Sequence, residues 1–377
     1  MKLALVVPGG VDRSGEIRVI PALLSLIERL SRANEVHVFA LHQEPFAAKR
    51  RLAGATVHNI GDGWTQLRAL AAIRSEHRRA PFDLFQAIFS GPCGLIAVLA
   101  AKLLHRPALV HVAGVEPVAL HEIACGGRRT WKGRLREWFV LRHADVVTAA
   151  SAPMIDALQA LGASAQRLPL GVDLKKWPSL APRERRETPA RLIHVASLNR
   201  VKDQTTLLQA LAAVAGTGVD FRMDVVGVDT LEGEMQRLAR TLGLGERVRF
   251  HGFKTQSELR PMMEAADLLV ISSRHEAGPL VVLEAAIAGV PTVGTAVGHI
   301  AEWAPSAALA VPVANPARLA HAICLVLSNE GCRLYLARAA QGRALLEDAD
   351  FTARAFESLY LQRMRARNES TAATFVH

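Results

Sequence analysis

Short apolar runs rich in Val, Leu and Ile recur along the chain and alternate with longer segments of helical periodicity. Strands of a parallel sheet have this continuous apolar character because helices cover both faces of the sheet. The runs lie at 3–7, 36–41, 84–88, 109–113 and 145–149 in the first half, and at 192–197, 221–226, 247–250, 267–272 and 292–294 in the second. The alternation predicts an α/β fold with two parallel sheets wound with helices.

A polar segment rich in Pro, Arg and Glu separates the two series of strands, directly after Leu-Pro-Leu-Gly-Val-Asp at 168–173. A chain of 377 residues favours two domains of roughly 150–200 residues each. We therefore expect an N-terminal domain over 1–170, a linker over 171–189 and a C-terminal domain over 190–347. The last residues, 367–377, are predicted to form a disordered tail.

Composition narrows the class of protein without naming its partner. Hydrophobic residues make up 50% of the chain and aromatic residues 5%, which is typical of a globular α/β protein and argues against disorder. The four cysteines lack Cys-x-x-Cys or zinc spacing, so we expect neither disulfides nor a structural metal, and a reducing cytoplasm. No run resembles a signal peptide or approaches the ~18 apolar residues that span a bilayer. The net charge of +10 favours an anionic partner, which could be nucleic acid, a phospholipid surface or a nucleotide.

Two glutamates, Glu276 and Glu284, stand out because the second interrupts an apolar helix. Pro279 suits the first helical position, and Gly289 before Pro291 is a stop signal, so we predict a helix from 279 to 288. The neighbours of Glu284 on this helix are aliphatic or Ala, and an unpaired carboxylate there would cost several kcal/mol. This side chain therefore needs a partner.

The turn before this helix follows the apolar run at 267–272, so it lies at the carboxyl edge of the predicted sheet, where ligands bind. The amides of Leu280, Val281 and Val282 would then face the crevice and suit a phosphate. Glu284 lies about 7–8 Å along the axis from Pro279. The spacing fits an elongated ligand with a central phosphate and hydroxyl groups at each end, as in a nucleotide-sugar. The alternative is an ion pair of Glu284 with a core Arg and a solvated Glu276.

Two other turns are candidates for anion binding. The first strand ends at Pro8, Gly9 and Gly10, and glycines there let backbone amides approach an anion, with a helix opening near 16–18. The Rossmann and P-loop fingerprints are absent, so a tight turn without a ligand is an equal alternative.

The turn after the strand at 192–197 contains Arg200 and Lys202, with Asp203 capping the next helix. These cations would lie at the carboxyl edge, where a developing phosphate charge would be found, although they could also be solvated surface residues. Because this turn and the one before Glu276 leave the same edge, we interpret them as one site.

A basic segment at 126–143 combines cations with aromatic residues at helical spacing. Arg128, Arg129 and Lys132 surround Trp131, and such a helix can lie in the interface of an anionic membrane. The alternative is a domain-packing helix with core aromatics and solvated arginines.

Taken together, these segments resemble family four of the retaining glycosyltransferases, which have the GT-B architecture of two facing Rossmann-like domains. The resemblance covers most of the chain and rests on the paired glutamates Glu276 and Glu284, on Pro-Leu-Gly-Val-Asp at 169–173, and on Leu-Asn-Arg-Val-Lys-Asp at 198–203. It implies a hexosyltransferase that moves a sugar from a nucleotide-diphosphate donor to a hydroxyl acceptor with retention of configuration, in polysaccharide or glycolipid assembly. No metal or other cofactor is implied.

The resemblance also assigns roles to residues. Glu276 would contact hydroxyls of the donor sugar, Glu284 the ribose, and Lys202 with Arg200 the leaving diphosphate. The implied donor-binding positions are Gly9, Gly10, Ser197, Phe253, Gly278, Pro279, Leu280 and Val281; Gly9 and Gly10 would close over the donor from the other domain, and Phe253 would border the base. A final helix at 348–366 would cross back to the first domain.

Two departures from the family pattern keep a second function open. Ser197 stands where the family usually has Arg, and Ala113 where it often has His; His111 would face the opposite side of its strand. The alternative is a catalytically inactive nucleotide-binding scaffold of a polysaccharide assembly system. Nucleic-acid binding is suggested by charge alone and lacks any motif. The expected partners are therefore a nucleotide-sugar, a carbohydrate or lipid-linked acceptor, and the inner face of an anionic membrane.

Overall fold

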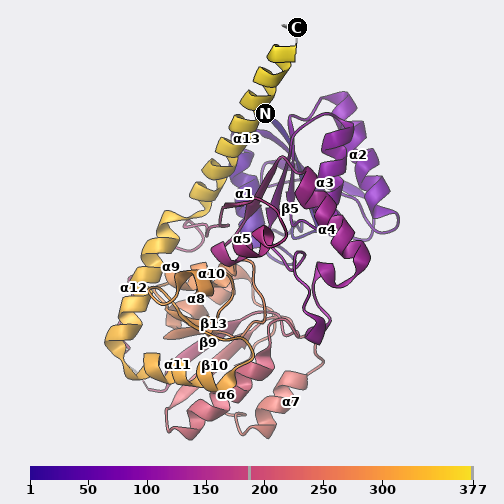
Figure 1. The fold of residues 1–377 in the computed structure, drawn as a ribbon. Coiled ribbons are helices and arrows are strands. Elements are labelled where there is room, and N and C mark those ends of the chain that lie inside the picture. The colour runs from indigo at the N-terminus through magenta and orange to yellow at the C-terminus, as the bar shows by residue number, and fades with distance from the viewer. Residues whose placement is uncertain (186–187, 375–377) are drawn as a thin grey trace. The chain divides into compact units, whose positions relative to one another are not determined.

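The computed structural model describes residues 1–185 and 188–374. The chain forms two compact units. The N-terminal unit contains Met1–Leu170 together with Ala349–His377, and the C-terminal unit contains Gly171–Asp348. Each unit is an α/β structure around its own sheet (Figure 1).

The sheet of the N-terminal unit has eight strands in the order β3-β4-β2-β1-β5-β6-β7-β8. Its strands are β1 (Lys2–Val7), β2 (Glu35–Ala40), β3 (Ala48–Leu52), β4 (Ala55–Asn59), β5 (Leu84–Ile88), β6 (Ala108–Val112), β7 (Val146–Ala149) and β8 (Gln166–Arg167). All neighbours are parallel except β3 and β4, which are antiparallel. The predicted parallel sheet is confirmed, but β3, β4 and β8 were not predicted.

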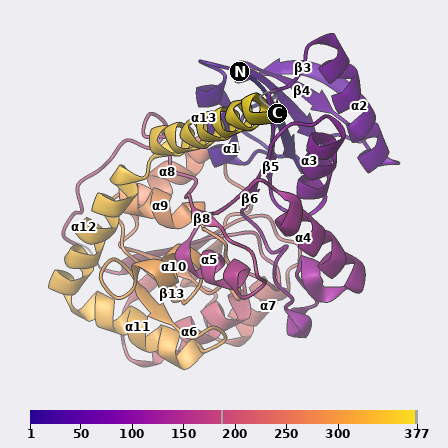
Figure 2. The same ribbon diagram turned by 45° about the horizontal axis from the view of Figure 1, so that its top comes forward.

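Helices cover both faces of this sheet, which accounts for its continuous apolar strands. One face is covered by α1 (Pro21–Leu30) and α13 (Ala349–Thr374), which contribute Leu23, Ile27 and Phe356 to its core. The other face is covered by α2 (Thr65–Arg79), α3 (Pro92–Leu103) and α4 (Trp131–His143), which contribute Ile73, Ile96 and Val140. Figure 2 shows α13 lying beside α1. The short helix α5 (Ala152–Gln159) connects β7 to β8.

The last helix belongs to the N-terminal unit. Phe356 and Tyr360 of α13 are fully buried there, and the Tyr360 hydroxyl donates to Gln86 Oε1. The disordered tail predicted over 367–377 is wrong for most of its length, because α13 continues to Thr374. Ala, Arg and Glu favour helix and no Gly or Pro interrupts them. Residues 375–377 lie outside the described part of the chain.

The sheet of the C-terminal unit has six parallel strands in the order β11-β10-β9-β12-β13-β14. They are β9 (Ala190–Val195), β10 (Phe221–Val226), β11 (Val248–Phe250), β12 (Leu268–Ile271), β13 (Thr292–Thr295) and β14 (Leu309–Val311). One face packs against α6 (Gln204–Gly216), α7 (Glu234–Thr241) and α11 (Pro316–Ser328). The other packs against α8 (Gln256–Ala265), α9 (Leu280–Ile287), α10 (Gly298–Trp303) and α12 (Glu330–Leu346).

The segment expected as a linker at 171–189 starts inside the C-terminal unit. Val172 and Trp177 are core residues, and the Trp177 indole N–H donates to Gln256 Oε1. Apolar burial of these two side chains explains why the polar composition around them misleads. Residues 186 and 187 lie outside the described residues. Over the ranges that are described, no helix is long and apolar enough to cross a membrane.

Candidate functional site

The order of strands in the C-terminal unit changes direction between β9 and β12. From β9 the chain proceeds outward to β10 and β11, whereas β12, β13 and β14 extend from the other side of β9. Ligands of open α/β sheets bind at the carboxyl ends of the strands at such a switch point. The turns after β9 and β12 are the two that the sequence analysis interpreted as one site.

Hydrogen bonds join these two turns. Ser272 Oγ donates to the carbonyl of Lys202 at 2.8 Å, and the Arg274 amide donates to the carbonyl of Val201 at 2.7 Å. Arg274 Nε also lies 2.6 Å from Asp203 Oδ2, and Asp203 caps the start of α6. The position of Lys202 is therefore set by contacts with the turn after β12.

The Lys202 ammonium contacts Glu276 directly. Lys202 Nζ donates to Glu276 Oε1 at 2.6 Å, and Ser273 Oγ donates to the same oxygen at 2.7 Å. Both charged side chains are partly shielded from water, which strengthens their attraction. The structure thus brings together two of the three predicted catalytic residues, which are 74 positions apart in sequence.

The third, Arg200, has another partner. Its guanidinium makes a bidentate ion pair with Glu234 at the start of α7, with distances of 2.9 and 2.7 Å. The planar fork of Arg matches a carboxylate well. We therefore correct the expected grouping, because Arg200 is held toward α7 and not beside Lys202 and Glu276.

The helix after Glu276 begins one residue later than predicted. Pro279 is the N-cap with extended backbone, and α9 starts at Leu280, so the amides of Leu280 and Val281 lie in its first turn. Gly278 precedes the cap. Gly298, at the start of α10, packs against this turn: a Cβ on Gly298 would lie 2.7 Å from Pro279 Cδ and 3.3 Å from Glu276 Cβ.

Replacing Gly298 with alanine is expected to displace the turn that holds Glu276. The residue has a φ of +48°, so alanine would be strained as well as crowded, and we expect unfolding to become easier by about 1–2 kcal/mol. Affinity for a nucleoside diphosphate should also fall. Gly218→Ala is the matched control, since Gly218 has a φ of +82° with nothing within 4 Å of the added Cβ. Equal destabilisation and unchanged affinity in both variants, measured by denaturation and calorimetry, would contradict a crowding effect.

Glu284 is buried on α9. Only 4% of it is exposed, and no ion pair to it occurs in the residues that the structure describes. Burial raises the pKa of this carboxyl to about 7, while a hydrogen bond from Gln256 lowers it. Since the Gln256 carbonyl accepts from Trp177, its amide N–H group is oriented toward Glu284. The alternative, an ion pair of Glu284 with a core arginine, is therefore absent from the part of the chain that the structure describes.

His194 in β9 supports the turn after β9 through hydrogen bonds. It was not predicted as a site residue. His194 Nδ1 donates to the Val270 carbonyl at 2.8 Å, so its Nε2 accepts from Gln204 Nε2 at 3.2 Å. Burial lowers its pKa to about 4, which keeps the ring neutral. Gln204 Nε2 also donates to the carbonyl of Ser197, which is exposed at the end of β9. A histidine inside an apolar strand gives no sequence signal of this role.

The other residues predicted to bind the donor lie after the ends of other strands. Phe253 is exposed after β11. Gly10 in the N-terminal unit has a φ of +77°, and its carbonyl accepts from Ile20 N at 3.0 Å, with Gly9 just before it. This loop is longer than predicted, because α1 begins at Pro21 and not near 16–18. A bridge between Val11 and Val19 closes the loop.

His111 is a core residue of the N-terminal unit. Its ring packs edge-on against Phe356, and Nδ1 lies 3.0 Å from Thr148 Oγ1. Complete burial lowers its pKa to about 3. The expectation that His111 faces the opposite side of its strand is wrong, because residues two apart share a face: His111 packs against Phe356, which lies in the same core layer as Leu109 and Ala113.

The basic segment forms α4, which presents aromatic residues to solvent. Trp131, Leu135 and Trp138 are 64%, 55% and 55% exposed along one side of the helix. Lys132 lies over the Trp131 ring at 5.7 Å, and Arg129 donates to the Ala124 carbonyl. Trp131 and Trp138 are therefore not the core residues that the packing-helix alternative required, whereas Phe139 does pack against the core.

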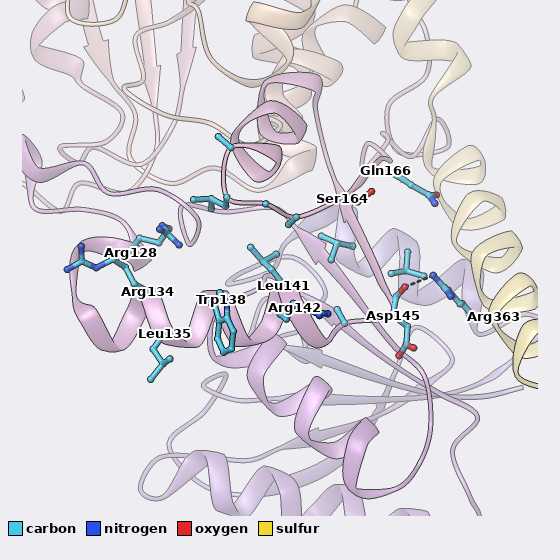
Figure 3. A pocket seen from close by; sticks show the side chains of 17 residues that line it. Arg128, Arg134, Leu135, Trp138, Leu141, Arg142, Asp145, Ser164, Gln166 and Arg363 are labelled. Carbon is cyan, nitrogen blue, oxygen red and sulfur yellow. Dashed lines mark hydrogen bonds between the residues drawn. The ribbon is translucent and has the colours of Figure 1, made fainter. Parts of the chain in front are cut away.

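A groove of about 950 Å³ runs along the adjacent side of α4 within the N-terminal unit (Figure 3). Its arginines are Arg128, Arg134, Arg142 and Arg363, and Figure 3 shows Arg363 donating to the Asp145 carbonyl. Leu135 and Trp138 border this groove and also a neighbouring apolar hollow. Cationic and apolar surfaces are thus continuous along this helix.

Relatives of known identity match most of the chain. Among curated proteins, glycogen synthase of Mycobacterium tuberculosis is 30% identical to this protein over 62% of the chain, and the alignment spans 58% of that relative's length. D-inositol 3-phosphate glycosyltransferase of Salinispora tropica is 29% identical over 85% of the chain and 76% of its own length.

Solved structures share the fold of the whole chain. Sucrose-phosphate synthase of Thermosynechococcus elongatus superposes with a TM-score of 0.79 at 19% identity, over 97% of this chain and 100% of its own. Anabaena HepE in complex with UDP-glucose superposes with a TM-score of 0.75 at 18% identity, over 96% of this chain and 100% of its own. These likenesses confirm the predicted GT-B fold.

Two family models divide the chain between them. The model for Glycosyltransferase Family 4 matches residues 22–176, and the model for Glycosyl transferases group 1 matches residues 176–343. The second contains the joined turns at Lys202 and Glu276 and the buried Glu284. The chain belongs to the glycosyltransferases that combine these two domains.

Proposed function

We propose that the protein transfers a hexosyl group from a nucleotide-diphosphate donor to a hydroxyl acceptor with retention of anomeric configuration, in polysaccharide or glycolipid assembly. The observation that carries this proposal is the contact of Lys202 with Glu276 at the topological switch point of the C-terminal unit. Membership of the glycosyltransferases supports the reaction class. The UDP-glucose bound to the related HepE supports a nucleotide-sugar as donor.

In this proposal the leaving diphosphate is stabilised by charge and by backbone amides. Lys202 faces the negative charge that gathers on the departing oxygen, and the amides of Leu280 and Val281 hold the distal phosphate. Arg200 is engaged by Glu234, so the main catalytic charge is assigned to Lys202. No metal is required for this step.

The two glutamates would recognise opposite ends of the donor. Glu276 accepts from sugar hydroxyls, and its orientation is fixed by Lys202 and Ser273. Glu284 accepts from the ribose hydroxyls, and Gln256 orients it. A donor hydroxyl would also supply the polar partner that a buried carboxylate needs.

Retention follows in this proposal from attack on the face that the diphosphate leaves. The bond from the anomeric carbon to the phosphate oxygen breaks, and the bond to the acceptor oxygen forms. The acceptor's proton passes to the departing phosphate oxygen, so no side chain has to act as nucleophile.

Release of nucleoside diphosphate from a panel of sugar nucleotides tests the proposed function. We expect release with at least one donor, an α-linked product from an α-linked donor by NMR, and loss of release in Glu276→Ala. Glu246→Ala, an exposed glutamate away from the turns, is the control. Binding without release, and no effect of Glu276→Ala, would favour the inactive nucleotide-binding scaffold instead.

We also propose that α4 attaches the protein reversibly to the inner, anionic face of a membrane, with the rest of the molecule in the cytoplasm. The exposed Trp131, Leu135 and Trp138 suit the interface, and the adjacent arginines suit lipid phosphates. A lipid-linked acceptor would be met at the same surface.

Retention on vesicles of phosphatidylglycerol and phosphatidylcholine checks this attachment. Replacing Arg128, Arg129 and Lys132 with Ala is expected to weaken binding at low salt by roughly 100-fold, because each cation contributes about 1 kcal/mol. Salt should weaken wild-type binding in the same way. In the control variant Arg74, Arg78 and Arg79 on α2 are replaced with Ala, and its binding should stay close to that of the wild type. No retention of the wild type at low salt, or equal retention of both variants, would contradict the attachment.

A further inference from the structure

Three side chains of the kinds that bind metals converge inside the N-terminal unit, between its sheet and α2. They are His37 of β2, His58 of β4 and Glu76 of α2, and all three are buried. One potential ligand atom of each lies within 4.8 Å of the other two. No other such group of three occurs in the part of the chain that the structure describes. None of the three residues has a part in the proposed function.

The two imidazoles are already spaced for a shared ion. His37 Nδ1 lies 3.0 Å from His58 Nε2, because the two residues lie on neighbouring parallel strands. Two nitrogens that a tetrahedral Zn²⁺ holds at about 2.0–2.1 Å are roughly 3.3–3.4 Å apart, so a small shift would admit the ion. Phe39 packs against His58 at a ring separation of 4.6 Å, and Phe82 packs edge-on against His37 at 5.3 Å. These two phenyl rings hold both imidazoles in place.

His37 also has the outer partner that a metal-bound histidine usually has. Such a histidine donates its second ring N–H to a carboxylate or a carbonyl, which leaves the other nitrogen to bind the ion. His37 Nε2 lies 2.9 Å from Glu35 Oε1, and Lys2 Nζ lies 3.2 Å from the same oxygen. His37 therefore carries its proton on Nε2, and without the ion its Nδ1 accepts from His58 Nε2. Zinc binding would move the proton of His58 to Nδ1 of its own ring.

Glu76 is paired with two cations but can still bind an ion. Lys49 Nζ and Arg79 Nη1 lie 3.0 and 3.2 Å from Glu76 Oε1. A carboxylate has about four lone-pair positions on its two oxygens, so Glu76 can bind a metal and keep these contacts. The side chains of Lys49 and Arg79 are 50% and 70% exposed, so both can also move toward water. Their positive charges oppose a divalent ion and so lower its affinity.

We propose that His37 Nδ1, His58 Nε2 and a carboxylate oxygen of Glu76 bind Zn²⁺, with water as the fourth ligand. Imidazole and carboxylate are both zinc ligands, and three protein ligands with one open position are a known zinc arrangement. The ion would tie α2 to β2 and β4. The spacing of the cysteines predicted no structural metal, but this cluster contains no cysteine. Zinc binding here is independent of the proposed sugar transfer.

Zinc uptake by the whole chain, after metals have been removed with a chelator, tests the proposal. Calorimetric titration should show zinc binding, and zinc should raise the midpoint of thermal unfolding because it binds the folded cluster and not the unfolded chain. His58→Phe keeps an aromatic ring beside Phe39, and Glu76→Gln keeps the side-chain shape. Each is expected to weaken zinc binding by roughly 100-fold. His42→Ala, which removes an exposed histidine that pairs with Asp62, should bind zinc as the wild type does.

Two exposed residues beside the ligands keep the test decisive if a buried variant does not fold. Glu35→Gln loses the carboxylate that orients His37, and should weaken zinc binding about tenfold. Lys49→Met removes a charge that competes for Glu76, and should strengthen zinc binding about tenfold. X-ray absorption of the zinc-loaded protein should show nitrogen and oxygen ligands and no sulfur.

Three results of the titrations would each overturn the proposal. The first is a wild type that binds no zinc, and the second is wild-type affinity in folded His58→Phe and Glu76→Gln. The third is unchanged affinity in both Glu35→Gln and Lys49→Met. A sulfur ligand in the absorption spectrum would also overturn it, because the ion would then lie at a cysteine.

Discussion

Replacement of Lys202 with methionine is expected to lower the turnover number by roughly 100- to 1,000-fold, the effect of removing one preorganised charge at a departing group. Lys202 Nζ is the cation that contacts Glu276 at the switch point, at 2.6 Å. Methionine keeps most of the volume of the partly exposed side chain, so the fold should persist. Rates of nucleoside diphosphate release at saturating donor measure the change.

Two controls separate this effect from a general loss of charge. Lys254→Met removes a surface lysine that pairs with Glu258 on α8, and should leave turnover unchanged. Arg200→Met should reduce turnover less than Lys202→Met, because Glu234 already holds that guanidinium. A turnover of Lys202→Met within about threefold of wild type would show that the leaving group is stabilised elsewhere.

Replacement of Glu284 with glutamine is expected to weaken nucleoside diphosphate binding by roughly 10- to 100-fold and, at alkaline pH, to stabilise the protein. The loss of affinity follows from removing a charged acceptor for ribose hydroxyls, worth about 1.5–3 kcal/mol. Calorimetric titration with UDP, ADP and GDP measures it. Unchanged affinity for a nucleotide that binds the wild type would remove Glu284 from the site.

The stability change has a definite sign. Burial raises the pKa of Glu284 from 4.5 to about 7, so the folded protein holds this proton more tightly than the unfolded chain. Below pH 4.5 Glu284 is protonated in both the folded and the unfolded chain, so it adds nothing to the pH dependence of stability. Between pH 4.5 and 7 the free energy of unfolding falls as pH rises. Above pH 7 ionisation of the buried Glu284 lowers it by its full amount, on the order of 3 kcal/mol. Glutamine does not ionise and should abolish this part of the pH dependence.

Urea unfolding at pH 5 and pH 8 measures the difference. The Glu284→Gln variant should be more stable than the wild type at pH 8 and nearly equal to it at pH 5. A variant less stable than the wild type at pH 8 would show that the carboxylate serves the fold and not a ligand.

The sequence predicted the fold well where burial is apolar, and poorly where it is polar. The runs at 84–88 and 221–226 coincide with β5 and β10. Strand β4 was missed because it buries His58 and Asn59; His58 Nε2 lies 3.0 Å from His37 Nδ1 of the neighbouring β2. Strand β3 was missed because Lys and Arg fill its centre, as is common at a sheet edge.

The candidate site could be predicted as far as topology determines it. Lys202 and Glu276 were grouped because the carboxyl ends of neighbouring parallel strands share one edge, and the structure joins them. The pair of Arg200 with Glu234, and the chain of contacts from Trp177 through Gln256 to Glu284, could not be predicted. They depend on which side chains from distant segments face each other, which periodicity does not encode.

The joined turns after β9 and β12 are proposed to bind the diphosphate of a nucleotide-sugar. Backbone hydrogen exchange of the whole chain, with and without UDP, ADP or GDP, tests this binding most directly. A nucleotide that binds is expected to slow exchange at residues 198–203 and 280–282, and Lys202→Met is expected to reduce this protection. Binding of a nucleotide with no slowing at these amides would show that the diphosphate does not bind at the joined turns.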